Sequence, residues 1–287
     1  MQTAPTRTTR FAPSPTGHLH KGHAYSALLA SHWAEQSDAR FLLRIEDIDH
    51  TRCSAEHTTQ IFEDLEWLGL EWELPVRIQS EHREDFEKTA ETLSTAGFLY
   101  PCFCTRKDIE REIANLARAP HPGDVPLYPG TCRRLSADER ESRLSKGDPH
   151  SLRLDLDQAI DSIGSDLFWQ DSFNGPQIAE PERLGDAIIS RKDIGTSYHL
   201  AVTHDDALQS VTDVIRGVDL WESTHLHVVL QTLLGYPIPT YHHHELLTDA
   251  SGNRLAKRDR SITLKQLRES GTTPTKLREE LESQLDL

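Results

Sequence analysis

Apolar residues at regular spacing predict alternating strands and helices over the first hundred residues. Leu29 and Trp33, for example, are four residues apart, the spacing of neighbours on one face of a helix. The stretch from Arg40 to Ile45 is instead a short apolar run of strand length, bounded by acids. The elements predicted here are strands over 8–12 and 40–45 and helices over 22–36, 58–68 and 86–96.

Residues 101–182 interrupt this pattern. They hold three cysteines, a stretch rich in proline and glycine over 120–130, and several short elements. The predicted elements are a charged helix over 136–146 and strands over 151–156 and 167–169. We interpret this part as an inserted region with its own small core.

The alternating pattern returns at about Gly185. It predicts strands over 187–190, 198–203 and 211–215 and a helix over 223–234, and His242 to His244 are expected in a loop. An α/β pattern split by an insert favours a nucleotide-binding parallel sheet with a domain inserted between its halves. The predicted divisions are two catalytic halves over 1–100 and 185–245, the insert over 101–184, and a basic loop with a helical tail over 246–287.

Composition narrows the class of protein. The chain has 287 residues, of which 36% are hydrophobic and 27% charged, as in a globular protein. No apolar run approaches the ~18 residues of a membrane span and the polar N-terminus shows no secretory signal, so we expect a cytoplasmic protein without a membrane partner. The net charge of −15 argues against DNA and against non-specific nucleic-acid binding. Any contact with RNA must therefore come from local basic patches, namely the basic stretch from Arg254 to Arg268 and the arginines near Cys132.

The first candidate for chemistry is the segment from Pro13 to His23, where a predicted strand runs through a Pro/Gly loop into a helix. Free N–H groups and the positive end of the dipole make a helix N-terminus favourable for phosphate. Gly22 allows a nucleotide close to the backbone, and His20 and His23 can hydrogen-bond phosphate oxygens. A polar loop with surface histidines is the alternative, because the chain has 16 histidines.

Three acids and two arginines follow the apolar strand, between Arg44 and Arg52. Ligands of open α/β sheets bind beyond the carboxyl ends of strands, and a carboxylate there can hold a substrate ammonium group. A salt-bridged strand end would give the same sequence.

Three of the four cysteines lie close together in the sequence: Cys102, Cys104 and Cys132. Clustered thiols in a cytoplasmic chain suggest metal ligands before disulfides, and thiolates suit zinc. Structural zinc takes four ligands, so Tyr128, His121 or the more distant Cys53 would complete the set. The alternative is a group of thiols that behave as small apolar residues.

A basic motif, Arg254-Leu255-Ala256-Lys257-Arg258, follows Ser251-Gly252. A glycine-containing loop with a lysine can close on a leaving pyrophosphate, although most such runs are solvated faces.

The triple histidine, His242 to His244, could bind a metal, but no acid or cysteine pattern supports a metal site there.

Taken in order, these segments resemble those of class I aminoacyl-tRNA synthetases of the glutamyl type. The run from His20 to His23 resembles the HIGH motif, and Arg254 to Arg258 stand where KMSKS belongs. Residues 10–17 resemble the family's opening segment, and residues 44–49 resemble its acidic strand end. Residues 198–206 and 214–220 resemble parts of its second half. The resemblance covers about residues 8–265 and implies a class I fold, with a Rossmann-type parallel sheet split by a zinc-binding insertion.

Within that family the chain is most similar to a short branch without the helical anticodon-binding domain. That branch activates L-glutamate with ATP in the absence of tRNA and attaches it to the queuosine base in the anticodon of tRNA(Asp). The resemblance implies ATP, Mg²⁺ accompanying ATP, L-glutamate and tRNA(Asp) as partners, and we expect a monomer. The residues after Arg258 are too few for an anticodon-binding domain of ~100 residues.

The resemblance also implies roles for individual residues, and the chemistry of their side chains agrees with these roles. An arginine can hold a carboxylate in a bidentate fork, a glutamate can hold an ammonium group, and a tyrosine can contribute a hydroxyl. The glutamate site would consist of Arg10, Ser14, Glu46, Tyr198 and Arg216. The catalytic residues, which would also bind ATP, would be His20, His23 and Lys257. One structural zinc ion per chain would be held by Cys102, Cys104, Tyr128 and Cys132.

The sequence departs from the family's motifs at three positions. Arg254 replaces the first lysine of KMSKS, and Ala256 replaces its serine, which removes a neutral hydrogen bond of about 1 kcal/mol. Lys21 adds a charge within the HIGH-like motif. Two alternatives stay open: a compact glutamyl-tRNA synthetase that charges a tRNA 3′ end, and an inactive, zinc-stabilised RNA-binding module. The retained Lys257 argues against the second, as do both histidines.

Overall fold

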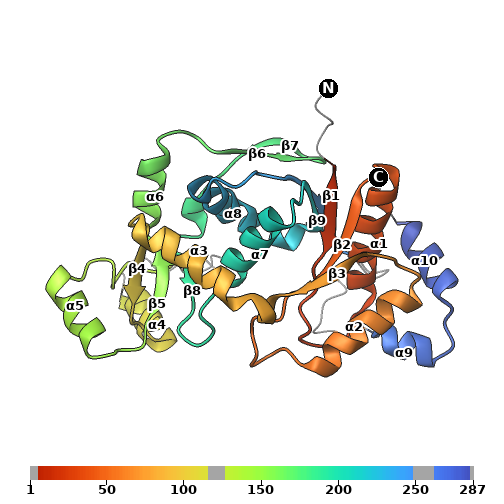
Figure 1. The fold of residues 1–287 in the computed structure, drawn as a ribbon, viewed down its shortest axis with the longest axis horizontal. Coiled ribbons are helices and arrows are strands. Elements are labelled where there is room, and N and C mark those ends of the chain that lie inside the picture. The colour runs from red at the N-terminus through yellow and green to blue at the C-terminus, as the bar shows by residue number, and fades with distance from the viewer. Residues whose placement is uncertain (1–5, 116–126, 248–261, 285–287) are drawn as a thin grey trace.

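The computed structural model describes residues 6–115, 127–247 and 262–284, and strands alternate with helices along most of the chain (Figure 1). The strands are β1 (Thr8–Phe11), β2 (Arg40–Ile45), β3 (Glu73–Ile78), β4 (Leu99–Cys102), β5 (Ser151–Leu154), β6 (Phe168–Asp171), β7 (Gly175–Ile178), β8 (Ile188–Ser190), β9 (Asp213–Gly217) and β10 (Thr240–His244). The α-helices are α1 (Lys21–Gln36), α2 (Ala55–Trp67), α3 (Arg83–Thr95), α4 (Arg106–Asn115), α5 (Ala137–Ser145), α6 (Leu156–Ile163), α7 (Tyr198–Leu208), α8 (Trp221–Leu234), α9 (Leu264–Glu269) and α10 (Pro274–Glu282). Short 3₁₀ helices lie at Gln79–His82, Pro181–Arg183 and Val218–Leu220.

Two sheets meet side by side in the middle of the molecule. One is parallel with the order β3-β2-β1, and the other has the order β7-β6-β10-β9, in which β10 runs parallel to β9 and β6. Strand β1 lies beside β9, where the Thr212 N–H donates to the Thr8 carbonyl at 2.9 Å. The carboxyl ends of β1, β2 and β9 therefore come together, which is where ligands of open α/β sheets bind.

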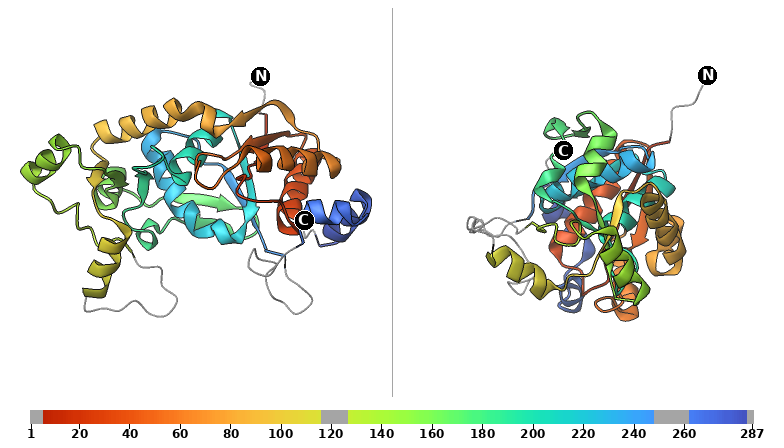
Figure 2. Two further views of the ribbon diagram at one scale, coloured as in Figure 1. Left: turned by 90° about the horizontal axis from the view of Figure 1, so that it is seen from below. Right: turned by 90° about the vertical axis from the view of Figure 1, so that its left-hand side faces the viewer.

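Helix α1 connects β1 to β2 and fills the core between the first sheet and the C-terminal helices. Leu28 and Leu29 of α1 belong to the same buried cluster as Leu43 of β2 and as Leu277 and Leu281 of α10. Helices α9 and α10 therefore lie against α1 and α2 (Figure 2). This packing holds residues 262–284 against α1, whose first turn carries the HIGH-like motif.

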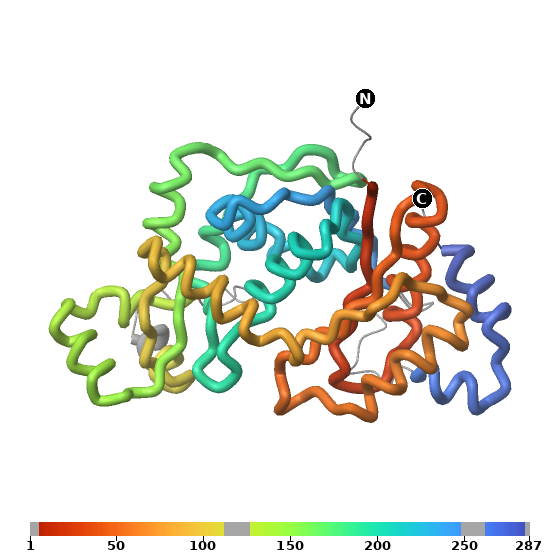
Figure 3. Tube along the Cα trace, in the orientation of Figure 1, coloured from red at the N-terminus to blue at the C-terminus, as the bar shows by residue number. Residues whose placement is uncertain are grey.

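A smaller antiparallel sheet, of order β4-β5-β8, lies toward the end of the molecule opposite to α9 and α10 (Figure 3). Tyr100, Cys102, Phe103 and Cys132 form a small core beside it. The predicted division of the chain at 100, 184 and 245 stays a prediction, and strand pairing crosses it. Strand β8 joins β5, whereas β6 and β7 join β10 in the sheet of order β7-β6-β10-β9.

Most of the predicted elements are confirmed. The strand predicted over 40–45 is β2, and the helices predicted over 22–36, 58–68 and 223–234 are α1, α2 and α8 with slightly shifted ends. Within the described part of the chain, no helix has the length and apolar character needed to cross a membrane.

Two predictions for the second half are wrong. Residues 198–203 are not a strand but the start of α7, whose N-cap Ser197 accepts a hydrogen bond from the Leu200 N–H at 3.4 Å. Residues 200–203 are all buried, which hides the helical period. His242 to His244 are not a loop but the end of β10. All three side chains are buried, and each ring has a polar partner inside the protein, which offsets the cost of burying it.

Candidate active site and metal centre

The first turn of α1 places the two histidines of the HIGH-like motif side by side. His20 is the N-cap of α1, and its Nδ1 accepts from the Gly22 N–H at 3.1 Å. The Nδ1 of His23 accepts from the His20 N–H at 3.2 Å, and the two ring centroids lie 3.8 Å apart. Both rings thus satisfy backbone donors of the first turn, which fixes their direction at the helix N-terminus.

The chain returns to this turn after residues 248–261. Thr263 forms an antiparallel bridge with His20, and the Leu264 N–H donates to the Leu19 carbonyl at 2.8 Å. Lys257 lies outside the described residues, together with Arg254 and Ala256, so its role stays a prediction. The described residues that follow this basic motif are nevertheless bound to the HIGH-like turn.

Arg10 and Arg44 share one buried carboxylate beside Glu46. Arg10, on β1, donates to both oxygens of Asp206 on α7, at 2.9 and 3.3 Å. Arg44, on β2, is fully buried, and one terminal nitrogen lies 2.8 Å from Asp206 Oδ1 and 3.0 Å from Glu46 Oε1. The guanidinium fork of Arg10 is therefore engaged by a protein carboxylate, a contact that the sequence did not predict.

Burial and the two arginines act in opposite directions on the acids of this network. Burial raises the pKa of Glu46, against the lowering effect of Arg44 and Arg10. Burial also opposes ionisation of Asp206, but Arg10 and Arg44 outweigh it and lower its pKa. Asp206 is therefore held ionised beside the two arginines, and a further cation beside Glu46 would lower the pKa of that acid.

Arg216, on β9, is buried, and its hydrogen bonds within the described residues go to neutral acceptors. Its Nε lies 3.1 Å from His243 Nε2, and one terminal nitrogen lies 3.4 Å from His227 Nδ1. The other terminal nitrogen lies 2.5 Å from Thr224 Oγ1 and 3.2 Å from the Leu220 carbonyl. Burial lowers the pKa of both histidines, which keeps them neutral. Unlike that of Arg10, this positive charge is balanced by no carboxylate contact among the described side chains.

Tyr198, the first residue of α7, lies between these two groups. Its ring centroid is 5.6 Å from that of His227, which contacts Arg216. Burial raises the pKa of Tyr198, and the charges of Arg216, Glu46 and Arg10 also act on it. The structure thus brings Arg10, Glu46, Tyr198 and Arg216 together, whereas Ser14 lies exposed in the loop after β1.

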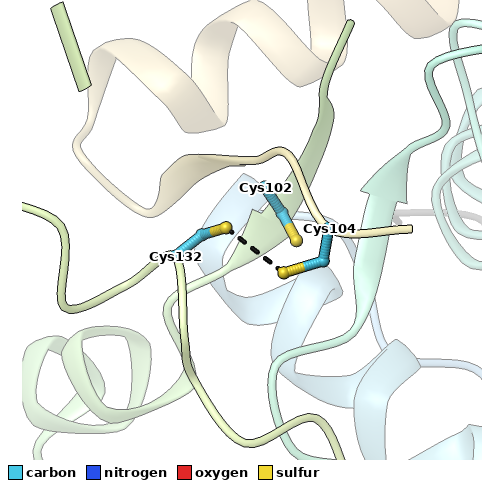
Figure 4. Close-up of side chains that lie close together, drawn as sticks. All are labelled: Cys102, Cys104 and Cys132. Atoms are coloured by element: carbon cyan, nitrogen blue, oxygen red, sulfur yellow. Dashed lines mark hydrogen bonds between the residues drawn. The ribbon is translucent and has the colours of Figure 1, made fainter. Parts of the chain in front are cut away.

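The side chains of Cys102, Cys104 and Cys132 point toward one another beyond the end of β4 (Figure 4). Their sulfur atoms all lie within 4.8 Å, with 3.5 Å between those of Cys104 and Cys132. The Tyr128 hydroxyl is 3.4 Å from the Cys102 sulfur and 3.6 Å from the Cys104 sulfur. Tetrahedral zinc with bonds near 2.3 Å needs sulfur atoms about 3.8 Å apart. The four side chains therefore fit a closed structural zinc site.

The two other candidates for the fourth zinc ligand differ in position. The Cys53 sulfur faces the Glu46 carbonyl at 4.0 Å and is not part of the cysteine cluster. His121 lies outside the described residues. The Tyr128 ring is in addition held in place by Arg153, whose guanidinium carbon lies 3.8 Å from the ring centroid.

Sequence reasoning gave no individual role to Arg44 or Asp206. Arg44 stands between apolar residues in a buried strand, and a charge at such a position requires a partner. The position of Arg44 in an apolar strand could therefore have indicated a buried ion pair. Asp206 lies 196 positions from Arg10, and no local pattern in the sequence indicates which arginine it contacts.

Part of the basic surface expected to contact RNA is paired within the protein. Arg268 lies 3.2 Å from Glu63, and Arg133, next to Cys132, lies 2.8 Å from Asp157 and 3.3 Å from Asp186. The charge of these two arginines is therefore partly balanced by neighbouring acids.

Comparison with known proteins identifies the family. A family model for class I tRNA synthetases (E and Q), catalytic domain, matches residues 7–283. A curated protein of Rhodobacter capsulatus named glutamyl-Q tRNA(Asp) synthetase is 44% identical, over 94% of this chain and 98% of that protein. A protein of the same name from Symbiobacterium thermophilum is 41% identical, over 92% of this chain and 82% of that protein.

A solved structure agrees with the fold. Glutamate-tRNA synthetase from Elizabethkingia anophelis superposes with a TM-score of 0.76 at 28% identity. The match covers 88% of this chain but 53% of that one, so the chain spans about half of its length. This chain therefore belongs to the class I tRNA synthetases of the E and Q type, in the group that includes proteins named glutamyl-Q tRNA(Asp) synthetase.

Proposed function

We propose that this chain activates L-glutamate with ATP and transfers the glutamyl group to the queuosine base in the anticodon of tRNA(Asp). The observation that carries the choice of amino acid is the environment of Arg216. It is a buried guanidinium with neutral partners among the described residues, beside Tyr198 and close to Glu46. The acceptor is inferred from the names of relatives that align over nearly the whole chain.

Each group of the substrate has a chemically suitable partner. The α-carboxylate of glutamate has to remain reactive, so Arg216 binds the side-chain carboxylate, with the Tyr198 hydroxyl as a further donor. Glu46 holds the ammonium group, whose charge favours the ionised form of this buried acid. Arg10 lines the site, but its fork is directed at Asp206. Ser14 contributes from the loop after β1.

The reaction has two steps. An α-carboxylate oxygen attacks the α-phosphorus of ATP and pyrophosphate leaves, which gives glutamyl-adenylate. A hydroxyl of the queuosine then attacks the glutamyl carbonyl, and AMP leaves. Neither step needs an enzyme nucleophile, because positioning and charge stabilisation do most of the work in such transfers.

The ATP site lies at the first turn of α1. His20 and His23 are fixed at the helix N-terminus, which suits phosphate. Lys257 neutralises the leaving pyrophosphate, and Thr263, six residues later in the sequence, contacts His20 at this turn. Mg²⁺ accompanies ATP. Zinc held by Cys102, Cys104, Tyr128 and Cys132 stabilises the insert and takes no part in the chemistry.

Glutamate-dependent exchange of pyrophosphate into ATP tests the first step. Purified protein without tRNA should catalyse the exchange with L-glutamate, whereas L-glutamine should support at most a small fraction of that rate, because its neutral amide leaves the charge of Arg216 unpaired. Equal exchange with both amino acids would contradict the assignment of Arg216. Exchange that appears only after tRNA is added would contradict tRNA-independent activation.

A further inference from the structure

Asp171, His243 and Arg216 form a buried line of hydrogen bonds behind the proposed glutamate site. The Nδ1 of His243 lies 2.9 Å from Asp171 Oδ2, and both side chains are completely buried. On the other edge of the same ring, Nε2 lies 3.1 Å from the Nε of Arg216. His243 is the middle residue of the triple histidine on β10, for which the sequence indicated no role.

The chemistry of the partners fixes the proton of His243. The Nε of arginine only donates, so Nε2 of His243 has to accept. The single proton of the neutral ring then lies on Nδ1 and is donated to Asp171. Burial opposes ionisation of Asp171, but hydrogen bonds from His243 and Asn174 lower its pKa to about 2. Asp171 is therefore an ionised acceptor.

Asp171 is itself held firmly by the turn between β6 and β7. Its second oxygen, Oδ1, accepts from the Phe173 N–H at 3.1 Å, the Asn174 N–H at 2.9 Å and Asn174 Nδ2 at 2.8 Å. With three donors on one oxygen and the His243 ring on the other, the carboxylate has no freedom to turn. The fixed carboxylate holds the His243 ring in one orientation through the hydrogen bond between them.

We infer that Asp171 and His243 are positioning residues that orient Arg216 toward a substrate carboxylate without cancelling its charge. A carboxylate in place of His243 would form an ion pair with Arg216, as Asp206 does with Arg10. A neutral acceptor fixes the direction of the guanidinium and leaves its positive charge for the ligand. This inference rests on the proposed role of Arg216 in binding glutamate.

Two substitutions of His243 separate its bond to Arg216 from its bond to Asp171. His243→Gln and His243→Met both lose the ring contact with Asp171, but only glutamine offers an acceptor near the position of Nε2. We expect His243→Met to raise the Kd and the KM for glutamate at least tenfold, with little change in kcat or in the KM for ATP. His243→Gln should restore glutamate binding to within about threefold of wild type.

Asp171→Asn tests the tautomer with His243 in place. The amide oxygen has to face the three donors of Phe173 and Asn174, so the NH₂ group faces Nδ1 of His243. The ring then takes its proton on Nε2, where the Thr224 hydroxyl at 3.1 Å can accept it, and the hydrogen bond from the Nε–H of Arg216 to the ring is lost. We expect the same loss of glutamate affinity as in His243→Met. If His243→Met does not fold, this variant, which preserves the shapes of both side chains, carries the test.

His242→Gln is the matched control, because His242 is buried on the same strand and contacts Asp213 at 2.9 Å rather than Arg216. It should bind glutamate as wild type does. Glutamate binding is measured by calorimetry, and kinetic constants by pyrophosphate exchange. If wild type binds glutamate and both Asp171→Asn and His243→Met bind it equally well, the inference is wrong. If wild type neither binds nor activates glutamate, the proposed function itself fails.

Discussion

Arg44 and Asp206 lie 2.8 Å apart, with their side chains 0% and 8% exposed, and join β2 to α7 at the edge of the candidate site. The same Asp206 receives two hydrogen bonds from Arg10. One carboxylate therefore pairs with two buried guanidinium groups from neighbouring parallel strands, and Glu46 is a second carboxylate partner of Arg44, at 3.0 Å. The geometry of the glutamate site depends on this acid, although the proposed mechanism gives it no contact with substrate.

Replacing Asp206 by asparagine should destabilise the protein strongly. The change removes the carboxylate charge that Arg10 and Arg44 share and leaves Arg10 with no carboxylate contact among the described side chains. Breaking such a buried pair costs roughly 3 to 5 kcal/mol. The free energy of unfolding from urea titration measures the effect. Asp166→Asn, at an exposed position, is the control and should change it by less than about 0.5 kcal/mol. Equal stability of the two variants would show that the network does not support the fold.

The buried histidines predict a loss of stability in mild acid. Burial, and next the charge of Arg216, lower the pKa of His199 from 6.5 to about 4. Between these values the unfolded chain binds a proton that the folded protein does not, so the free energy of unfolding rises with pH in this window. The contribution of His199 is present above pH 6.5 and is lost as the pH falls toward 4, by roughly 3 kcal/mol in all.

His199→Asn isolates this contribution. The asparagine amide can still contact His227, whose Nε2 lies 3.2 Å from Nδ1 of His199, but it does not titrate. Urea titrations between pH 4.5 and 7.5 should show a shallower dependence in the variant, equivalent to about one proton near pH 5. Identical slopes for wild type and variant would mean that His199 titrates normally in the folded protein.

The cysteine cluster predicts about one zinc ion per chain in protein purified without chelators. Tyr128→Phe keeps the ring but removes the hydroxyl that lies near two of the sulfur atoms. We expect it to weaken zinc binding at least tenfold in competition with a chromophoric chelator, and Cys104→Ser to lose the metal. Tyr236→Phe, outside the cluster, should bind zinc as wild type does. Wild-type affinity in Tyr128→Phe would exclude tyrosine as the fourth ligand.

Lys257 should contribute to the chemical step of activation. Lys257→Ala removes the charge proposed to neutralise the leaving pyrophosphate, and we expect kcat for pyrophosphate exchange to fall roughly 100-fold or more. Lys276→Ala, an exposed lysine on α10, is the control and should exchange at the wild-type rate. Exchange by Lys257→Ala at the wild-type rate would show that this segment does not act as a KMSKS loop.

The sequence predicted the features that depend on local pattern. The apolar run of β2, the periodic face of α1 and the spacing of the three cysteines each carry their own signal. Contacts between distant segments have no such signal. The pairing of Arg10 with Asp206 and the line from Asp171 to Arg216 exist only after the two halves of the sheet have met. The consecutive burial of residues 200–203 in α7 and the polar composition of β10 misled the prediction at 198–203 and 242–244.

The most direct test of the account is the choice of acceptor. Radiolabelled glutamate, ATP and the protein are incubated with two preparations of tRNA(Asp), one containing queuosine and one with unmodified guanosine at that position. We predict that label is incorporated only into the queuosine-containing tRNA, and that this tRNA is still labelled when its 3′-terminal adenosine has been removed before the reaction. Equal labelling of both preparations, abolished by removal of that adenosine, would show instead that the protein charges the 3′ end of tRNA.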